Sequence, residues 1–218
     1  FAFSAIANLA ACHSCHAELI EAGLLEHASA RLNSPDSNIR SSAVLCVANL
    51  VSNRSNHNVI VSGYQQLYID SLLELTKNSD EVTKLRAVKA LRGLACNRIF
   101  REAIVDKNVL ELILELCCRI GCSDNVQNCG NDDDELQIEV LASLCNLSLG
   151  GHLGSISTLL LNSFDSLRAL VSLLRSSHST HALFGAIALG NFALDPDTHD
   201  LLVEAGVVGA LLDTARTN

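Results

Sequence analysis

The sequence predicts an all-α fold in which one helical unit is repeated along the chain, and three observations support this prediction. A short pattern recurs five times, at a period of about 45 residues. Its apolar residues follow the 3.6-residue period of a helix. The composition also fits, because 49% of the 218 residues are hydrophobic and only 2 are Pro. Such a chain suits helices joined by Gly and polar turns.

The recurring pattern reads small-x-x-small-apolar-x-Asn-apolar-small. It occurs at Ala2–Ala10, Ala43–Val51, Ala87–Ala95, Val140–Ser148 and Gly185–Ala193. The residue at its Asn position, which we call position 0 of each repeat, is Asn8, Asn49, Gly93, Asn146 and Asn191. Positions −6, −2 and +1 lie on one helix face. The residue at position −3 is never larger than Cys, which lets a neighbouring helix approach closely.

Each repeat has a second half, in which a short apolar helix meets a turn residue and a further apolar helix follows. The turn residues are Gly23, Gly63, Asn108 and Gly206, with Asp165 at the matching place of the fourth repeat. Gly and Asn tolerate the left-handed backbone conformation that ends a helix. Polar linkers with helix-start signals come next, at Ser34–Asp36, Asn78–Asp80 and Ser176–Thr180. Each unit is therefore expected to hold a short, a medium and a long helix.

These segments resemble the armadillo repeat in combination. The likeness rests on Glu21-Ala-Gly23, on Leu170-Val-Ser-Leu-Leu174 and on the Ala-x-x-Ala-Leu-x-Asn-Leu form of the recurring pattern. The resemblance covers essentially the whole chain. It implies a right-handed α-solenoid of three-helix units, with a concave groove lined by the third helix. It also implies that partners lie in this groove as extended peptides held through Asn side chains.

We expect a single armadillo-repeat solenoid over residues 1–218, and a section of a longer array. The expected units are 1–11, which ends a third helix, then 12–52, 53–96, 97–149, 150–194 and the partial unit 195–218. The unit 97–149 is longer by one polar loop, 121–134, which we expect to be mobile. It contains the acidic run Asn131–Glu135. A surface insertion is the favoured interpretation, and an autoinhibitory strand is the alternative.

The net charge of −9 argues against nucleic acid as a direct ligand. Basic residues nevertheless gather on the third helix of the middle unit, at Lys84, Arg86, Lys89 and Arg92, followed by Arg98 and Arg101. The spacing of Arg86, Lys89 and Arg92 places all three broadly on one side of the helix. One interpretation is a solvated helix face. The other is a stretch of groove that faces acidic residues of a partner.

The recurring Asn residues allow two interpretations. A mid-helix Asn has poor helix propensity and a side chain that requires partners. The structural interpretation is that each Asn bonds the backbone of its own turn or linker and fixes the geometry between units. The functional interpretation is a ladder of amides that binds an extended peptide. The expected binding residues are then Asn8, Asn49, Arg86, Lys89, Arg92, Asn146 and Asn191.

No cofactor, metal site or catalytic residue is expected. Nine Cys, an odd number, favour reduced and mostly buried thiols in a cytoplasmic or nuclear setting. Cys12-His-Ser-Cys15-His16 matches a haem-attachment string, but it falls in a linker between units, and we interpret it as a plain loop. Cys117, Cys118, Cys122 and Cys129 lack the paired spacing of a zinc site. No stretch is long and apolar enough to span a bilayer.

The sequence therefore predicts a non-catalytic scaffold for protein–protein interaction, because phosphate-binding Gly loops and nucleophile motifs are missing. The alternative is the substrate-recruiting armadillo region of a larger enzyme such as a ubiquitin ligase. A nuclear-import adaptor is disfavoured, because that class pairs a groove Trp with the Asn four residues later. Here position −4 holds Ser4, Leu45, Lys89, Ala142 and Ile187.

Overall fold

The structure is a computed structural model that describes residues 2–105, 112–117, 131–149, 164–176 and 178–217. Every regular element among these residues is a helix, as predicted. The chain forms two compact units, Phe1–Ile104 and Val105–Asn218. Each unit is described by itself.

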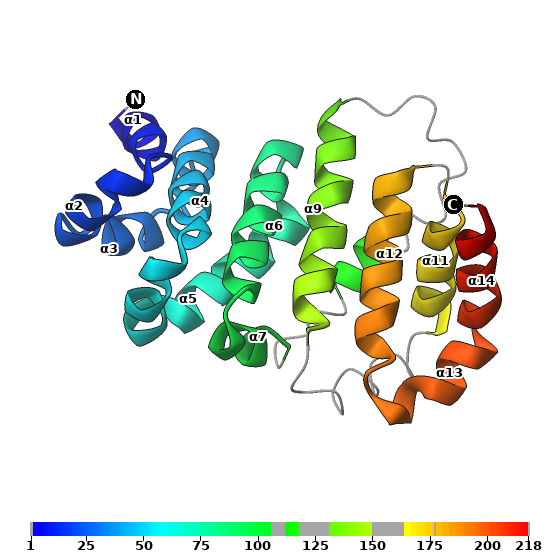
Figure 1. Cartoon of the computed structure of the whole chain (residues 1–218). Helices are drawn as coiled ribbons and strands as arrows, with labels where there is room; N and C mark the ends of the chain where they lie inside the picture. The colour runs from blue at the N-terminus through cyan, green and yellow to red at the C-terminus, as the bar shows by residue number, and fades with distance from the viewer. Residues whose placement is uncertain (1, 106–111, 118–130, 150–163, 177, 218) are drawn as a thin grey trace. The chain divides into compact units, whose positions relative to one another are not determined.

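In the first unit, the helices that carry the recurring pattern lie side by side. They are α1 (Ala2–Leu9), α4 (Ser37–Ser52) and α6 (Glu81–Ala95), and α4 lies between the other two (Figure 1). We call these the pattern helices. A second set packs against them, α3 (Leu24–Ser29) on α4 and α5 (His57–Asn78) on α6. The remaining elements are η1 (His13–Cys15), α2 (His16–Glu21), η2 (Arg54–Asn56) and α7 (Arg98–Val105).

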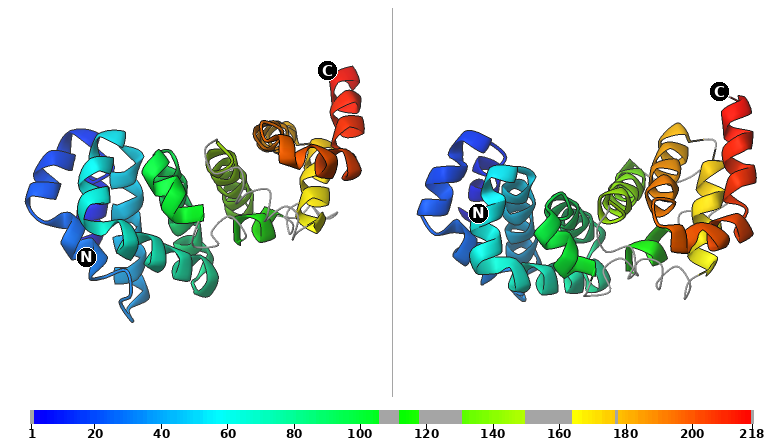
Figure 2. Two further views of the ribbon diagram at one scale, coloured as in Figure 1. Left: turned by 90° about the horizontal axis from the view of Figure 1, so that it is seen from below. Right: turned by 60° about the horizontal axis from the view of Figure 1, so that its bottom comes forward.

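The second unit repeats this arrangement. Its pattern helices are α9 (Asn131–Leu147) and α12 (Ser179–Phe192), which pack against each other. Helix α11 (Phe164–Leu174) packs against α12 and α14 (Val207–Thr217), and α13 (His199–Glu204) packs against α14 (Figure 2). The 3-10 turn η4 (Pro196–Thr198) leads into α13, and residues 112–117 are helical as well.

The core consists of the apolar and small positions of the pattern. In α4, α6, α9 and α12, the residues at positions −6, −3, −2 and +1 are all buried. In α1 the same positions are exposed or half-buried, because α1 is the first described helix of its row and only one side of it is covered. The helical period read from the sequence therefore identifies the buried face correctly.

Several predicted helix boundaries are confirmed. Gly23 and Gly206 both adopt a left-handed backbone with φ of +82°, and each turns the chain between two helices. Asp36 caps α4, where its side chain accepts from the N–H groups of Asn38 and Ile39. Asp80 caps α6 in the same way, accepting from the Thr83 N–H. These acceptors satisfy N–H groups that a helix start leaves unbonded.

The predicted turn at Gly63 is wrong, because α5 is one continuous 22-residue helix from His57 to Asn78. Gly in a helix interior costs only about 1 kcal/mol relative to Ala. The continuous helix fully buries Ile60, Tyr68 and Ile69, and each large buried side chain contributes about 1.5–3 kcal/mol. The Tyr68 hydroxyl also donates to the Leu25 carbonyl at 2.8 Å. The expectation of three separate helices therefore fails in this repeat.

Two further boundaries differ from the prediction. Asp165 lies in the first turn of α11 and not in the turn before it. Residues 131–134, predicted as part of the loop, begin α9. Three consecutive Asp residues at this start are compatible with a helix, because acidic side chains are favoured in a first helical turn. The rest of the predicted loop, 121–130, and the predicted turn at Asn108 lie outside the described residues.

Candidate partner-binding surface

In each unit, one Asn side chain at position 0 joins two neighbouring pattern helices. In the first unit, Asn49 Nδ2 on α4 donates to the Ala7 carbonyl on α1 at 3.0 Å. In the second unit, Asn191 Nδ2 on α12 donates to the Cys145 carbonyl on α9 at 3.2 Å. Both acceptors occupy position −1 of the preceding repeat. Asn8 is exposed on α1, and Asn146 is half-buried on α9.

This bond serves the carboxyl end of the preceding helix. The last carbonyls of a helix have no partner inside the helix and need one from elsewhere. At the end of α1, the N–H groups of the following turn bond the carbonyls of Ile6, Asn8 and Leu9. The Ala7 carbonyl receives Asn49 instead. Asn49 thus fixes the geometry between two repeats, as the structural interpretation expects, but its amide bonds the preceding pattern helix and not its own turn or linker. The binding of a peptide by Asn49 stays a prediction.

Gly93 replaces Asn at position 0 of α6 because there is no room for a side chain. A Cβ on Gly93 would lie 2.7 Å from Val51 Cγ2 and 3.3 Å from the Val51 carbonyl oxygen on α4. The carbonyl at position −1, on Ala48, also needs no Asn. Helix α4 continues to Ser52, and in an α-helix the N–H of a residue bonds the carbonyl four residues earlier. The Ser52 N–H is therefore the helical partner of the Ala48 carbonyl.

Arg86 forms a polar contact between α6 and α4. Its Nη1 donates to the Ser41 hydroxyl at 2.7 Å and to the Ser41 carbonyl at 3.1 Å. Lys89 and Arg92 lie half-buried further along the same helix. Lys84 pairs with Glu81 one turn earlier at 2.6 Å. The structure therefore brings the three predicted basic residues onto one helix, with Arg86 held in a contact between helices.

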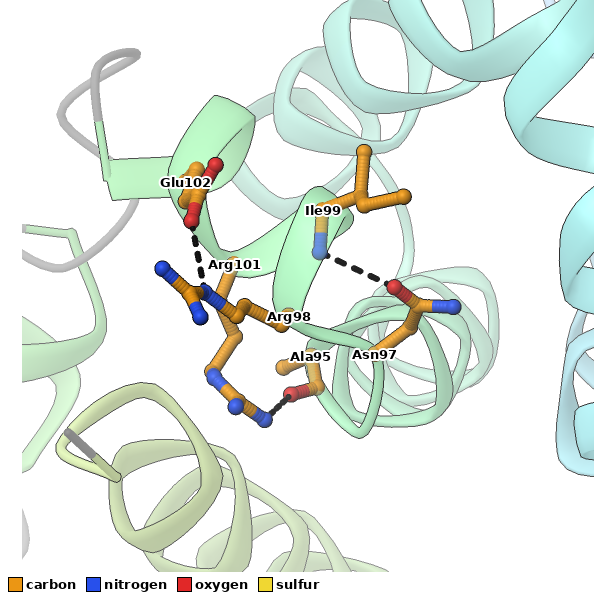
Figure 3. Close-up of polar contacts among 6 residues, drawn as sticks. All are labelled: Ala95, Asn97, Arg98, Ile99, Arg101 and Glu102. Atoms are coloured by element: carbon orange, nitrogen blue, oxygen red, sulfur yellow. Dashed lines mark hydrogen bonds and ion pairs between the residues drawn. The ribbon is translucent and has the colours of Figure 1, made fainter. Parts of the chain in front are cut away.

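The basic residues that follow α6 are held locally (Figure 3). Arg98 forms an ion pair with Glu102 at 3.0 Å. Arg101 turns back toward the end of α6 and donates from Nη1 to the Ala95 carbonyl at 3.0 Å. Local partners thus take up part of the positive charge that the sequence places in this stretch.

Sequence reasoning missed a second recurring column, at position +8. Its described members are His16, His57, Arg101 and His199. Each uses a side-chain nitrogen to bond the carbonyl at position +2 of its own repeat, at distances of 2.7, 2.7, 3.0 and 3.0 Å. Three of these four residues are His. Their constant offset of eight residues from position 0 is the signal that could have revealed them.

His16 also links two repeats. Its Nε2 bonds the Ala10 carbonyl at 2.7 Å, while its Nδ1 lies 2.8 Å from Asn56 Nδ2. Since Nε2 must donate to the carbonyl and Nδ1 must accept from the amide, the ring is a neutral imidazole with its proton on Nε2. Asn56 Nδ2 bonds the Leu50 carbonyl as well, at 2.8 Å. The end of each pattern helix is thus held by polar side chains.

Large apolar side chains are exposed near the Asn residues of the second unit, although Glu135 and Glu139 also lie on the Asn146 side of α9. On α12, Leu183 and Ile187 are exposed by 57% and 41%, and Leu194, two residues beyond its end, is exposed by 66%. Ile138 on the neighbouring α9 and Leu149, two residues beyond its end, are exposed as well. Leu183 and Ile138 occupy position −8, and Leu194 and Leu149 occupy position +3. Equivalent positions of two adjacent repeats therefore present large apolar side chains to solvent before and after each Asn in the sequence.

The buried thiols suit a structural role. Burial raises the pKa of Cys46 to about 12, and it does the same for Cys145. Cys145 Sγ lies 3.3 Å from the Phe184 carbonyl on the neighbouring pattern helix. Within the described ranges, no three His, Cys, Asp or Glu side chains gather in an arrangement that could hold a metal ion. In the same part of the chain, no helix combines the length and the apolar character that crossing a membrane requires.

Comparison with solved structures defines the class of fold. No protein-family model matches the sequence, and no curated protein matches it. An engineered protein is similar at 25% identity with a TM-score of 0.79, over 97% of this chain and 80% of its own. A designed armadillo repeat protein in complex with the peptide (KR)4 has 21% sequence identity and a TM-score of 0.78, and the match covers 97% of this chain and 83% of that one. A computationally designed armadillo repeat protein for modular peptide recognition has 22% sequence identity and a TM-score of 0.79, and the match covers 97% of this chain and 83% of that one. The fold is thus an all-α solenoid of the armadillo-repeat type, as its recurring pattern predicts.

Proposed function

We propose that this protein is a non-catalytic scaffold that binds an extended segment of a partner protein on the Asn-bearing faces of its pattern helices. The observation that carries the proposal is the state of the Asn amides. Asn49 and Asn191 are held in place by bonds from Nδ2, yet both residues remain half-exposed. Neither Oδ1 accepts a hydrogen bond from another described residue. Amides fixed in this way lose little conformational freedom when a ligand binds.

The bonding state of each amide specifies what the ligand must supply. Asn191 Nδ2 donates to the Cys145 carbonyl and, at 2.9 Å, to the Ser148 hydroxyl, so both of its hydrogens are in use. Only its Oδ1 remains for a ligand, which must therefore donate. Asn49 retains one hydrogen and its Oδ1. A peptide backbone offers an N–H and a carbonyl at every residue, which fits this requirement without a fixed side-chain sequence.

The side chains around the amides indicate the composition of the partner. In the first unit, Lys89 and Arg92 favour acidic residues in the segment that crosses α6. In the second unit, Leu183, Ile187 and Leu194 favour apolar residues in the segment that crosses α12. The designed protein mentioned above is described with a basic peptide, (KR)4. The charge at α6 predicts the opposite preference here.

The test is a peptide selection followed by substitution of single residues with Glu. Peptides are selected from a random library against the full chain, and binding is then measured for three variants. Lys89→Glu and Ile187→Glu should each weaken binding by tenfold or more. Lys77→Glu carries the same charge change as Lys89→Glu at an exposed site on α5 and should leave binding unchanged. The proposal is wrong if no peptide is enriched, or if all three variants bind the selected peptides equally.

A further inference from the structure

The turn between α1 and α2 differs from its counterparts at two positions, and both hold a cysteine. In three other repeats, position +4 carries an acceptor for the N–H two residues later. Asn53 accepts from Ser55 at 3.1 Å, Asn97 from Ile99 at 2.9 Å (Figure 3), and Asp195 from Asp197 at 3.1 Å. In the first repeat this position is Cys12.

Position +7 shows the same exchange. Asn56 and Thr198 bond the carbonyl at position +1 of their repeats, on Leu50 and Phe192, at 2.8 and 2.7 Å. In the first repeat position +7 is Cys15, and the equivalent Leu9 carbonyl accepts the backbone bond from the Cys12 N–H at 3.0 Å. The other two repeats make the same backbone bond, from the N–H groups of Asn53 and Asp195. The first repeat therefore has a thiol at position +4, where three other repeats have a polar acceptor. It has a second thiol at position +7, where two of them have a polar side chain and the α6 repeat has Phe100.

The backbone brings these two thiols close together. The Cys15 N–H donates to the Cys12 carbonyl at 3.0 Å, which closes a turn of four residues. Such a turn keeps its first and last Cα atoms within about 7 Å, and a disulfide spans roughly 4.4–6.8 Å between Cα atoms. Cys12 is exposed and Cys15 is half-buried, and both are reduced. A reagent in solution can therefore reach the pair.

The two cysteines are not equivalent nucleophiles. Hydrogen bonding lowers the pKa of Cys12, and the largest cause is the Ser14 hydroxyl, whose Oγ lies 3.0 Å from Cys12 Sγ. The Ser14 N–H and the Cys15 thiol act in the same direction. A thiolate, rather than a thiol, attacks a disulfide. Cys12 should therefore react first, with Cys15 as the resolving thiol.

We propose that Cys12 and Cys15 form a redox-responsive pair that closes to a disulfide on reaction with a small-molecule disulfide. The Cys12 thiolate attacks one sulfur of the reagent, forms a mixed disulfide and releases one reagent thiolate. Cys15 then gives up its proton and attacks the Cys12 sulfur, which releases the second reagent thiolate. The two protein thiols are oxidised by two electrons and the reagent is reduced to two thiols.

Glutathione disulfide, applied to the folded full chain near neutral pH, tests this pair. Tryptic cleavage after Arg31 yields the peptide Phe1–Arg31, which contains Cys12, Cys15 and no other cysteine. In the wild-type protein this peptide should lose the mass of two hydrogens and carry no glutathione. Cys15→Ser should stop at one attached glutathione. In Cys12→Ser, glutathione should attach to Cys15 at least about tenfold more slowly than it attaches to the wild-type peptide, because the more reactive thiolate is gone.

A matched variant separates this chemistry from general thiol exposure. Cys96→Ser removes a half-buried cysteine elsewhere in the same unit and should leave the oxidation of the peptide Phe1–Arg31 unchanged. Two results would overturn the inference. One is a wild-type peptide that keeps its glutathione and does not close. The other is a Cys12→Ser protein that is modified as fast as the wild-type protein.

Discussion

At the scale of single residues, the recurring polar side chains of this protein satisfy backbone carbonyls at helix ends. Asn49 and Asn191 reach the preceding pattern helix, whereas His57 and His199 reach back to the end of their own. A buried carbonyl without a partner costs about 1–3 kcal/mol. A polar residue on an apolar helix can therefore recur because it supplies a hydrogen bond to a carbonyl of a neighbouring helix. The same amide can still bind a ligand through the atoms that this bond does not use.

The Asn49→Ala substitution tests this role. It removes the bond to the Ala7 carbonyl and should lower the free energy of unfolding by about 1–3 kcal/mol. Asn8→Ala is the matched control, because Asn8 is exposed on α1, and surface substitutions usually change stability by less than about 0.5 kcal/mol. Urea unfolding of both variants provides the measurement. Equal stability of the two variants would show that the bond contributes nothing.

At the scale of helices, the caps and turns set where each element begins and ends. Asp80 caps the start of α6, where its Oδ1 accepts from the Thr83 N–H at 2.9 Å and its Oδ2 accepts from the Thr83 hydroxyl at 2.9 Å. Helices α3 and α14 each begin after a left-handed Gly. Helix α5 has no such break, although its sequence contains Gly63. The same residue type therefore has different consequences in different repeats.

The cap at Asp80 predicts a pH dependence. The hydrogen bond from the Thr83 N–H is the main cause that holds the pKa of Asp80 below its ordinary value. A carboxyl whose pKa is lower in the folded state stabilises the protein above its unfolded pKa, near 3.9, and this stabilisation is lost as the pH falls through the folded pKa. Asp80→Ala should cost about 0.5–2 kcal/mol at pH 7 and progressively less below pH ~4.

The control for this prediction is Asp80→Asn. Asn is also a good cap but does not titrate, so this variant should keep most of the stability at pH 7 and should not lose it in acid. The measurement is the midpoint of thermal unfolding from pH 7 to pH 2 for all three proteins. A constant difference between the wild-type protein and Asp80→Ala across this range would contradict the assignment.

The two kinds of Gly should respond oppositely to Ala. Gly63 lies inside α5, and nothing is within 4 Å of the Cβ that Ala would add. Gly63→Ala should therefore stabilise the protein by about 0.5–1 kcal/mol. Gly23→Ala should destabilise it by about 1–2 kcal/mol, because its φ of +82° is strained for a residue with a Cβ. Thermal unfolding compares the two variants, and a loss of stability in Gly63→Ala would restore the turn expected from the sequence.

The sequence predicts the buried face of each pattern helix because the spacing of apolar residues determines it. It predicts the turns at Gly23 and Gly206 because only local backbone strain is involved. The continuity of α5 depends on tertiary burial of Tyr68, which a local pattern does not contain. The acceptors of Asn49 and Asn191 lie more than 40 residues away, so only a known packing register could identify them. The peptide-binding role of these residues remains a prediction.

At the scale of the whole molecule, the two compact units raise the question of how far a disturbance in one unit extends. In an array of repeats, each repeat contacts mainly its neighbours, and stability is close to a sum of local terms. Each unit contains a buried thiol on a pattern helix, Cys46 in the first and Cys145 in the second, and burial raises the pKa of both to about 12. These thiols should react with an alkylating reagent only when their own unit opens.

A disturbance at Gly93 tests this expectation. Gly93→Ala would place a Cβ 2.7 Å from Val51 Cγ2, and Val is stiff, so the substitution should cost about 1–3 kcal/mol. Because each 1.4 kcal/mol is about a tenfold change in an opening equilibrium, alkylation of Cys46 should accelerate roughly tenfold, and that of Cys145 much less. Gly190→Ala, with nothing within 4 Å of its added Cβ, should accelerate neither. Peptide mass spectrometry resolves the two sites. If Gly93→Ala accelerates both thiols equally, the units open as a single cooperative body, and the local description of stability is wrong.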